Sequence, residues 1–415
     1  MAEEKKYDLI VIGGGASGLI AAGRAAERGK SVLLLEKNKK LGEKLKITGG
    51  GRCNITNAEE DEHILLKKYG EAEPYLYSTF AQFGVAETFK FFENWELPLV
   101  VQAGQRVFPQ TEKANDVFKV LEKYITTGKV VVKTGQAVTA IMKEGNKIKN
   151  VVAGRAEYSA HHYILATGGV SHPETGSTGD GFQWLANLGH TVIPPSPTIV
   201  PLAVSDQWVK SLAGVTLVAM KITFYVDGVK SFSTTGPLLF THFGLSGPLI
   251  LNSAKKVGDL LHEGVVTATI DIFPTFDLGG LEKKVVAIFD SNKNKSFKNV
   301  LKDIVPAGVA AGLLGSKILA IEADQKVHSV TKEDRKRLGR QLKSLPLSIT
   351  GLMGLDRAVV ADGGVPLSEI DTRTMRSKII TNLSLTGDLL HISRPSGGYS
   401  LQLCWTTGYV AGNHS

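Results

Sequence analysis

Hydrophobic and polar positions near the start of the chain follow the order of a strand, a helix and a second strand. The segments 7–12 (YDLIVI) and 31–36 (SVLLLE) are short apolar runs. Between them, residues 16–28 are mostly small or apolar, and Gly29 follows the last of them. Because a short apolar run bounded by turn residues is typical of a buried strand, this pattern predicts a βαβ unit with two parallel strands.

Three glycines separate the first strand from the helix. Gly13 permits a tight turn, Gly15 lets the backbone approach a pyrophosphate, and Gly18 lets the helix pack closely on the sheet. Glu36, eighteen residues after Gly18, is placed to accept hydrogen bonds from an adenosine ribose. The motif therefore predicts an adenine dinucleotide, either NAD or FAD. The residues expected to bind it here are Gly13, Gly15, Ala16, Ser17, Gly18 and Glu36.

The end of the chain favours FAD. Residues 379–388 are expected to form a strand that ends in Gly387-Asp388, and an apolar helix is expected from 396–402 (SGGYSLQ) to Ala411. In flavoproteins an acid at this place binds the ribityl chain, and the N-terminus of such a helix favours negative charge on the reduced flavin. A second Gly-rich fingerprint is missing from the middle of the sequence. NAD(P)H, if it is the electron donor, is therefore expected to dock transiently.

The remaining pattern predicts an α/β protein with insertions. Helices are expected at 80–95 and 115–125, and strands at 130–132, 137–142, 147–152, 163–169, 216–226 and 265–273. The prolines at 194–197 mark a boundary. We expect a Rossmann-like FAD-binding domain of the two-dinucleotide-binding flavoprotein type, formed by residues 1–192 and 346–415. An inserted β-barrel-like domain at 193–277 and a small helical module at 278–345 complete the predicted architecture.

The positive charge of the chain is concentrated in the helical module. The 415 residues carry a net charge of +8, and residues 278–345 hold 14 Lys and Arg against 7 Asp and Glu, a net +7. A helix over 332–345 would place Leu338, Leu342 and Leu345 on one face, with Lys336, Arg340 and Lys343 together on another. This stripe is either a solvated helix face or a surface for the phosphates of RNA.

Other sequence features indicate that the protein works in the reducing environment of the cytoplasm. Cys53 and Cys404 are far apart and indicate no disulfide framework. The N-terminus is charged and leads into the first core strand, and the longest apolar runs are shorter than the roughly 18 residues of a membrane helix. No metal-ligand spacing is found, since His161 and His162 would point to opposite faces of a strand. We expect a cytoplasmic protein without a metal site or membrane anchor.

Several blocks resemble one family of flavoproteins. The most specific are 41–57 (LGEKLKITGGGRCNITN) and 239–248 (LFTHFGLSGP), and shorter blocks stand at 106–109, 166–169, 175–181, 363–365 and 397–399. These blocks are similar to the BaiN-like/RdsA flavoproteins, which include NAD(FAD)-utilizing dehydrogenases and aminoacetone oxidase-like proteins. The chain departs from the family at Asp388, where a Glu is expected, and in the loop 391–396.

The resemblance and the two terminal motifs together imply a wider set of FAD-binding residues. Ala137 and Val138 stand where flavoproteins of this type contact adenine, and the glycines at 49–51 bring backbone close to the cofactor. The additional residues implied are Lys37, Lys44, Gly50, Gly51, Arg52, Cys53, Ala137, Val138, Ala166, Thr167, Gly168, Gly387, Asp388, Gly397, Gly398, Tyr399 and Ser400.

Four residues are candidates for the chemistry itself. Cys53 could protonate a substrate carbon or sense redox state, or it could be a small buried thiol. His172 and His242 could act as acids or bases, or they could be structural. Arg394, in the loop that departs from the family, could hold a substrate oxyanion.

The resemblance implies an FAD-dependent oxidoreductase that transfers a hydride between flavin N5 and an activated carbon. Members of the family reduce carbon–carbon double bonds of bile-acid intermediates or of a ribosomal RNA uridine, and some relatives are amine oxidases. The basic module favours a uridine of 23S ribosomal RNA as substrate. The alternatives are a small-molecule ene-reductase or amine oxidase, and a flavin-bound RNA-binding protein without turnover. The oligomeric state is left open.

Overall fold

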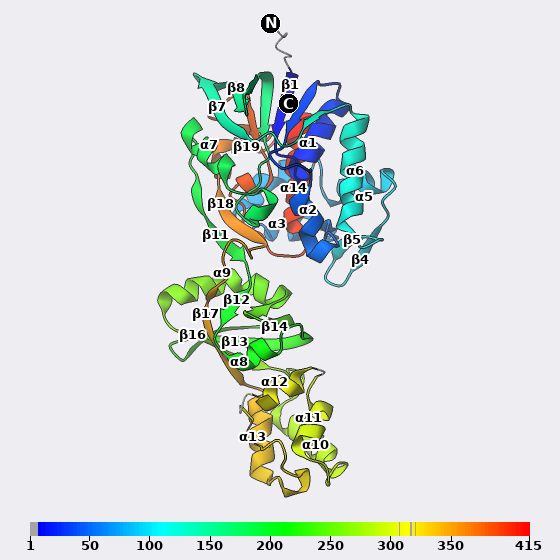
Figure 1. Cartoon of the computed structure of the whole chain (residues 1–415), viewed down its shortest axis with the longest axis vertical. Coiled ribbons are helices and arrows are strands. Elements are labelled where there is room, and N and C mark those ends of the chain that lie inside the picture. The colour runs from blue at the N-terminus through cyan, green and yellow to red at the C-terminus, as the bar shows by residue number, and fades with distance from the viewer. Residues whose placement is uncertain (1–6, 307, 316–317, 320) are drawn as a thin grey trace. The chain divides into compact units, whose positions relative to one another are not determined.

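A seven-stranded, mostly parallel sheet combines strands from the beginning and the end of the chain (Figure 1). β1 pairs in parallel with β10 and β2, β2 with β6, and β10 with β21, whereas β19 and β20 add an antiparallel edge. This arrangement confirms the predicted Rossmann-like α/β fold. The strands, in spatial order, are β19 (Ile370–Asp371), β20 (Arg376–Ser377), β21 (Leu383–Leu385), β10 (Ala160–Leu165), β1 (Tyr7–Ile12), β2 (Val32–Leu35) and β6 (Val131–Lys133).

The computed structural model describes residues 7–306, 308–315, 318–319 and 321–415. The chain divides into two compact units: the first comprises Met1–Ser196 and Val359–Ser415, and the second Pro197–Ala358. Each unit has its own hydrophobic core. The sheet described above belongs to the first unit.

The first unit also contains two small sheets and the helices that cover them. The sheets are β3 (Thr56–Asn57), β5 (Arg106–Pro109) and β4 (Leu99–Gln102), and β7 (Val138–Glu144), β8 (Lys147–Ala153) and β9 (Ala156–Tyr158). The helices are α1 (Ala16–Glu27), α2 (Glu43–Ile47), α3 (Glu62–Lys67), α4 (Glu73–Phe80), α5 (Val85–Asn94), α6 (Ala114–Thr127), α7 (Asp180–Leu188) and α14 (Tyr399–Asn413). The prediction of a single helix over 80–95 was wrong. Gly84 begins a new helix there, and its N–H donates to the Glu87 carboxylate.

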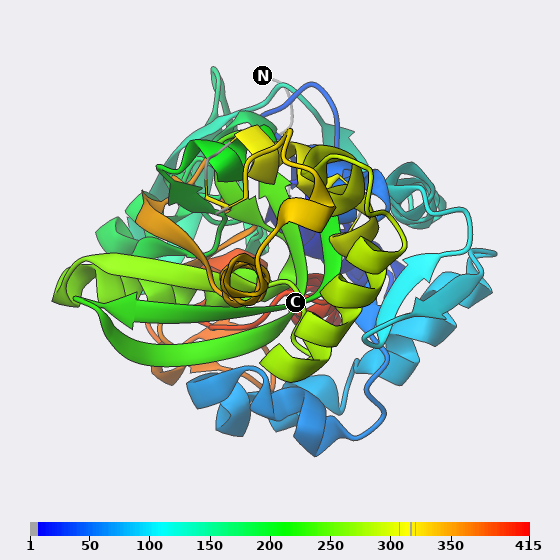
Figure 2. The ribbon, with the colours of Figure 1, turned by 90° about the horizontal axis from the view of Figure 1, so that it is seen from below.

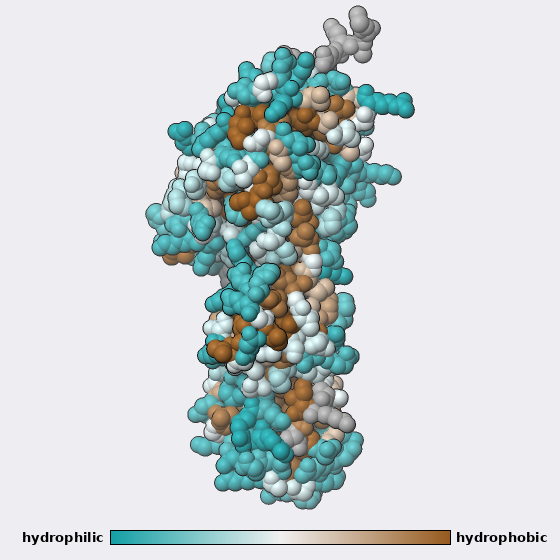
Figure 3. Space-filling model, turned by 90° about the vertical axis from the view of Figure 1, so that its left-hand side faces the viewer, coloured by the Kyte–Doolittle hydropathy of each residue, from teal (hydrophilic) through white to brown (hydrophobic). Residues whose placement is uncertain are grey.

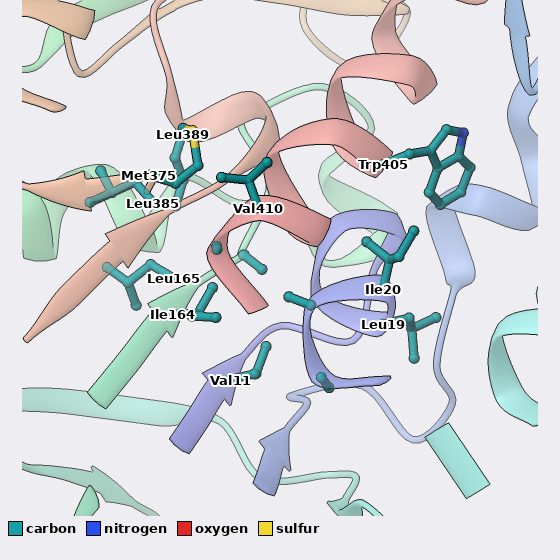
Figure 4. Close-up of a cluster of buried hydrophobic side chains, with 14 of the residues drawn as sticks. Val11, Leu19, Ile20, Ile164, Leu165, Met375, Leu385, Leu389, Trp405 and Val410 are labelled. Carbon is teal, nitrogen blue, oxygen red and sulfur yellow. The ribbon is translucent and has the colours of Figure 1, made fainter. Parts of the chain in front are cut away.

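Helices α1 and α14 pack against each other through small residues. A Cβ at Gly408 would lie 2.4 Å from the carbonyl oxygen of Ser17, and one at Gly412 would lie 2.3 Å from that of Ala21. The larger side chains of the two helices, such as Leu19 and Trp405, point into the surrounding core (Figure 4). Only glycine allows the two backbones to come this close.

The second unit is built around a closed antiparallel barrel, which confirms the predicted β-barrel-like insertion. Its long strands β13 and β14 run side by side (Figure 2). The chain returns to the first unit at 359 rather than at the expected 346, because β17 closes the barrel between β12 and β16. The barrel strands are β12 (Leu202–Val204), β15 (Gly244–Ser246), β14 (Val229–Thr241), β13 (Thr216–Val226), β16 (Val266–Asp271) and β17 (Leu345–Leu352). A two-stranded ribbon of β11 (Ile193–Ile199) and β18 (Val360–Gly364) stands where the chain passes between the units.

The expected basic module is helical, and its core is continuous with that of the barrel. Leu338 and Leu342 of α13 are fully buried in the same cluster as the barrel residues Ala268 and Ile270. The helices of the second unit are α8 (Gln207–Ser211), α9 (Pro248–Glu263), α10 (Leu278–Asp290), α11 (Phe297–Ile304), α12 (Val309–Gly315) and α13 (Lys332–Leu342). Residues 278–345 therefore share one core with the barrel instead of forming a separate module.

The predicted basic stripe on α13 needs a correction at Lys343. This residue caps the helix, and its Nζ donates to the carboxylate of Asp271 at 2.8 Å and to the carbonyl oxygen of Phe276 at 2.6 Å. The ion pair is mostly buried, so Lys343 holds α13 on the barrel and does not face solvent with Lys336 and Arg340. Arg340 is itself paired with Glu333 at 2.8 Å.

Hydrophilic residues dominate the lower part of the face shown in Figure 3, on the side where α13 lies in Figure 1, and apolar residues are scattered among them. Among the described residues, no helix combines the length and the hydropathy needed to span a membrane.

Replacing Gly408 by alanine is expected to destabilise the first unit, because the new Cβ would press on the Ser17 carbonyl. Overpacking of this kind costs about 1–3 kcal/mol. The free energy of unfolding from urea denaturation checks this. Gly339→Ala is the matched control: a Cβ at Gly339 of α13 meets nothing within 4 Å, so that change should stabilise by about 0.5–1 kcal/mol. A Gly408→Ala variant as stable as the parent would contradict the close packing.

Candidate functional site

The turn between β1 and α1 uses its three glycines for different purposes. Gly13 has a φ of +109°, and a Cβ there would lie 2.4 Å from the carbonyl oxygen of Ala166. A Cβ at Gly18 would lie 1.9 Å from the carbonyl oxygen of Gly13, whereas a Cβ at Gly15 would meet nothing within 4 Å. Gly13 and Gly18 are therefore required by packing, and the open space at Gly15 leaves the N-terminus of α1 accessible to a phosphate group.

A pocket opens at the carboxyl ends of β1 and β2, beside this turn. Glu36 lies in its wall with both carboxylate oxygens held: Oε2 accepts from the N–H of Gly14 and Oε1 from the N–H of Asn38, each at 2.7 Å. A carboxylate oxygen has a second lone pair, so Glu36 can still accept from a ligand hydroxyl. The pocket is lined by Ile12, Gly13, Leu35, Glu36, Lys37, Gln136, Val138, Thr167, Gly176, Thr178, Asp180 and Trp184.

Part of the pocket wall comes from residues 175–181, a segment whose role the sequence did not predict. Gly176, Thr178 and Asp180 of this segment line the pocket. Lys37 Nζ donates to Asp180 Oδ2 at 2.9 Å and to Thr178 Oγ1 at 2.5 Å. Burial raises the pKa of Asp180, but the hydrogen bonds from Lys37 and Thr178 outweigh it and hold the pKa below its ordinary value. The block 175–181 stood out in the sequence only as a family resemblance, and its glycines could have indicated a wall this close to the nucleotide turn.

The residues at 137–138 and 166–168 contribute unequally. Val138 and Thr167 line the pocket, and Ala137 is not among its lining residues. Ala166 is buried and packs against Gly13, and Gly168, with a φ of +72°, lies against Ser177. Ala166 and Gly168 are held by these packing contacts and are not among the residues that line the pocket.

A second cluster joins Lys44, Asp388 and Arg394. Lys44 Nζ lies 3.4 Å from Asp388 Oδ2, and Arg394 Nη2 donates to Asp388 Oδ1. A Cβ at Gly169 would lie 3.4 Å from the Cβ of Asp388, which places the cluster beside the loop that follows β10. Burial raises the pKa of Asp388, but the charges of Arg394 and Lys44 hold it below its ordinary value.

The side chain of Arg394 is buried, whereas the role suggested from the sequence needs it open to a substrate. Its side chain is 1% exposed, with Nε donating to Ser400 Oγ at 3.0 Å and Nη1 to the carbonyl oxygen of Ile392 at 2.7 Å. A guanidinium engaged in this way cannot reach out to hold a substrate oxyanion. The structure gives Arg394 a role within the protein, next to Asp388 and the first turn of α14.

The signature loop around residues 48–54 places its side chains in two ways. A Cβ at Gly50 or Gly51 would meet open space, and the Arg52 guanidinium lies over the Phe108 ring at 4.5 Å and near Glu112 at 3.3 Å. Cys53 is fully buried, and burial raises the pKa of its thiol to about 12. Of the two interpretations of Cys53, burial supports the structural thiol over a residue that meets substrate.

The start of α14 is fixed by close backbone contact. Gly398 has a φ of +103°, and a Cβ there would lie 2.2 Å from the carbonyl oxygen of Thr56. Tyr399 follows as the first helical residue and is mostly buried. Gly397, with a φ of +122°, accepts a hydrogen bond through its carbonyl from Asn57 Nδ2 at 3.1 Å. The glycines thus bring the helix N-terminus against β3.

The two candidate histidines lie in different units. His172 has a φ of +55°, and its Nδ1 is bonded to Glu174 Oε1 at 2.8 Å. His242 is exposed on the second unit, where its ring lies 4.9 Å from that of Phe243. Their roles in proton transfer stay predictions. Within the described ranges, no group of three His, Cys, Asp or Glu side chains could hold a metal ion.

The residues present fit an adenine dinucleotide. Gly13 lines the pocket together with Glu36, and the open space at Gly15 lies two residues farther along the same turn. The two sites are therefore neighbours. Two buried polar atoms that lack a partner in the described structure, Asn54 Oδ1 and His391 Nδ1, belong to the signature loop and the loop before α14. The glycines at 49–51 of the signature loop were predicted to lie close to the cofactor, so a bound group there would supply the missing contact of Asn54.

The fold and this site define the class: a Rossmann-fold, FAD-dependent oxidoreductase. Residues 7–414 match the family described as HI0933-like protein Rossmann domain, and the chain belongs to this family. The resemblance seen in the sequence is thereby confirmed.

Two curated relatives align along nearly their whole length. The chain is 31% identical over 405 residues to the 3-dehydro-bile acid delta(4,6)-reductase of Clostridium scindens, covering 97% of both chains. It is 27% identical over 416 residues to the ribosomal RNA dihydrouridine synthase of Haemophilus influenzae, covering 97% of this chain and 96% of that one.

Among solved structures, the fold is similar to that of 3-ketosteroid-delta4-(5alpha)-dehydrogenase from Rhodococcus jostii RHA1. The TM-score is 0.55 at 14% identity, covering 99% of this chain and 97% of that one.

Replacing Glu36 by glutamine is expected to weaken FAD binding. Glutamine keeps one acceptor oxygen and loses the charge, and a hydrogen bond to a charged group contributes about 1.5–3 kcal/mol, so the FAD dissociation constant should rise by roughly tenfold or more. Fluorescence titration of the apoprotein with FAD measures it. Glu71→Gln, at an exposed position of the same unit, is the control and should bind like the parent. Equal affinity for both variants would remove Glu36 from the site.

Replacing Asp388 by asparagine is expected to destabilise the fold, because Arg394 would remain buried without a carboxylate. Breaking such a pair costs about 3–5 kcal/mol. The folded-state pKa of Asp388 lies below its ordinary value of 3.8, so its contribution is fully present above that pH and is lost as the pH falls through the folded-state pKa. The stability difference between parent and variant should therefore be constant from about pH 7 to 5 and shrink below about pH 4. Urea denaturation across this range tests both parts, and a difference independent of pH would contradict them.

Proposed function

We propose that this chain uses FAD to reduce a carbon–carbon double bond conjugated to a carbonyl group. The observation that carries the proposal is the end-to-end similarity to two enzymes whose names imply such substrates. A 3-oxo bile acid with delta(4,6) unsaturation has a double bond conjugated to a ketone, and forming dihydrouridine saturates a ring double bond conjugated to a carbonyl. The shared requirement is hydride delivery to an electron-poor carbon.

The FAD cofactor, when bound, supplies the hydride in this proposal, and the protein supplies position and polarity. The open backbone at Gly15 and the N-terminus of α1 would hold the pyrophosphate, and Glu36 the adenosine ribose. Asp388 would hold the ribityl chain from a carboxylate fixed by Arg394. The N-terminus of α14 favours negative charge beside it, because its backbone N–H groups have no partner within the helix.

Proton transfer to the substrate is assigned to a side chain or to water. His172 is the candidate in the first unit: Glu174 holds its Nδ1, and within the described part of the chain Nε2 has no hydrogen-bond partner. The thiol of Cys53 is a poor alternative because it is fully buried. NAD(P)H as a transient electron donor is part of the proposal.

A conjugated small molecule is the first candidate substrate, and a uridine of 23S ribosomal RNA is the second. The charge of residues 278–345 favours RNA. Against it, Lys343 is neutralised by Asp271, which lies outside this segment, so the net charge of the segment falls from +7 to +6. Arg340 and Arg337 are also held in ion pairs, with Glu333 and Asp334, whose charges are already counted in the +7. Lys332 and Lys336 of α13 are exposed, and neither forms an ion pair with another described residue.

The proposal predicts that the reduced holoprotein, kept without oxygen, is re-oxidised by a conjugated steroid enone or by a uridine-containing ribosomal RNA fragment. The flavin absorbance near 450 nm measures this directly. Re-oxidation by either substrate and not by its saturated analogue supports double-bond reduction. An oxidised enzyme that is bleached by amines, with no response of the reduced enzyme to either substrate, would make it an amine oxidase. If neither the reduced nor the oxidised flavin responds to the enone, the RNA fragment or the amines, the result would favour a flavin-bound RNA-binding protein without turnover.

The RNA candidate predicts that the double variant Lys332→Gln/Lys336→Gln binds ribosomal RNA fragments with a weaker salt dependence. Removing one lysine–phosphate interaction lowers the slope of log affinity against log salt by roughly 0.7–0.9, so two such interactions account for at most about 1.8. Filter binding at several salt concentrations measures it. Lys67→Gln/Lys68→Gln, with the same charge change on exposed lysines of the first unit, is the control. If both variants show the same slope, the lysines of α13 do not contact RNA and belong to a solvated helix face.

A further inference from the structure

The cluster of Lys44, Asp388 and Arg394 contains two cations and one anion. Asp388 has one carboxylate oxygen bonded to Arg394 and the other 3.4 Å from Lys44 Nζ. Both oxygens of the cluster's carboxylate are therefore used within the protein, and the three side chains carry a net charge of +1.

Arg394 brings its charge to the beginning of a long helix. Its Nε bonds to the hydroxyl of Ser400, the second residue of the 15-residue helix α14. The first turn of α14 holds no acidic residue. A helix N-terminus already carries positive partial charge, so a buried cation is unfavourable there unless an anion accompanies it. Asp388 balances one of the two cations, and the helix end and the second cation remain uncompensated.

The neighbouring titratable groups do not supply the missing negative charge. Cys404 and Tyr399 lie close to the cluster, and burial raises the pKa of both, that of Cys404 to about 12, so they are neutral at pH 7. Tyr69 is fully buried and donates its hydroxyl proton to the carbonyl oxygen of Tyr399. The charge of Glu174 also acts on Lys44, but the two form no ion pair, and the Glu174 carboxylate is bonded to His172.

We propose that Arg394 is a positioning and charge-tuning residue, and that the net positive charge of its cluster with Lys44 and Asp388 raises the reduction potential of the bound FAD. The site then stabilises the two-electron-reduced cofactor, which carries more negative charge than the oxidised form. This inference rests on the proposed function in needing bound FAD at Asp388. It does not depend on the identity of the substrate.

The experiment compares the flavin potential of holoprotein variants by equilibration with redox dyes, with no substrate present. Arg394→Gln removes the charge and keeps a hydrogen-bonding side chain. It should disfavour the reduced form relative to the oxidised form on the order of tenfold, the scale on which one unit charge acts at short range inside a protein. For a two-electron couple this is about 30 mV toward more negative potential. The affinity of the oxidised flavin for sulfite should fall in the same direction.

Two further variants separate charge from structure. Arg394→Lys keeps the charge and should recover most of the parent potential. Arg373→Gln is the matched control, because it removes one positive charge from an exposed ion pair with Asp371 in the same unit. It should leave potential and sulfite affinity unchanged. A potential in Arg394→Gln equal to that of Arg373→Gln overturns the proposal.

Lys44→Gln keeps the test decisive if Arg394→Gln does not fold. Lys44 is 24% exposed and belongs to the same charged cluster, so its removal should also lower the potential with a smaller effect on folding. A folded, FAD-bound Lys44→Gln protein with the parent potential overturns the proposal. Because no substrate is used, a chain that binds FAD and reduces no conjugated double bond would contradict the proposed function and leave this inference standing.

Discussion

The close packing of α1 against α14 is the constraint on which the cofactor site depends. Gly408 and Gly412 allow the backbone of α14 to approach the carbonyls of Ser17 and Ala21. Each helix follows a strand of the same parallel sheet, so their N-termini emerge at the same edge. Any larger residue at these glycines would separate the turn proposed to hold the pyrophosphate from the helix proposed to face the flavin.

Buried polar contacts fix the register of this helix pair. Thr386 Oγ1 donates to Ser17 Oγ at 3.1 Å, and the N–H of Gly387 donates to Thr407 Oγ1 at 3.0 Å. Farther along α14, Gln402 accepts from Thr56 at 2.6 Å, which ties the helix to β3. Because unsatisfied buried groups are costly, these bonds disfavour a shift of the helix along its axis. Asp388 follows Gly387 directly, so the hydrogen bond of Gly387 to Thr407 also fixes the position of Asp388 relative to α14.

The second unit carries the positively charged segment 278–345 on the same core as the barrel. Its barrel and helices share one core, and the ion pair of Lys343 with Asp271 joins α13 to β16. Asp271 lies outside residues 278–345, so this pair lowers the net charge of that segment from +7 to +6. The anions of the pairs Arg340–Glu333 and Arg337–Asp334 are already counted in the +7.

The sequence by itself determined the cofactor-binding framework. The glycines at 13, 15 and 18 and the apolar runs beside them have few alternative folds, because local turn geometry and strand burial act over short distances. Only the tertiary structure decided where long side chains and distant segments meet. Residues 175–181 came to face Glu36, β17 closed the barrel instead of returning to the first unit, and Lys343 and Arg394 were drawn into ion pairs. These outcomes depend on which charges are buried together, and sequence spacing carries no information about that.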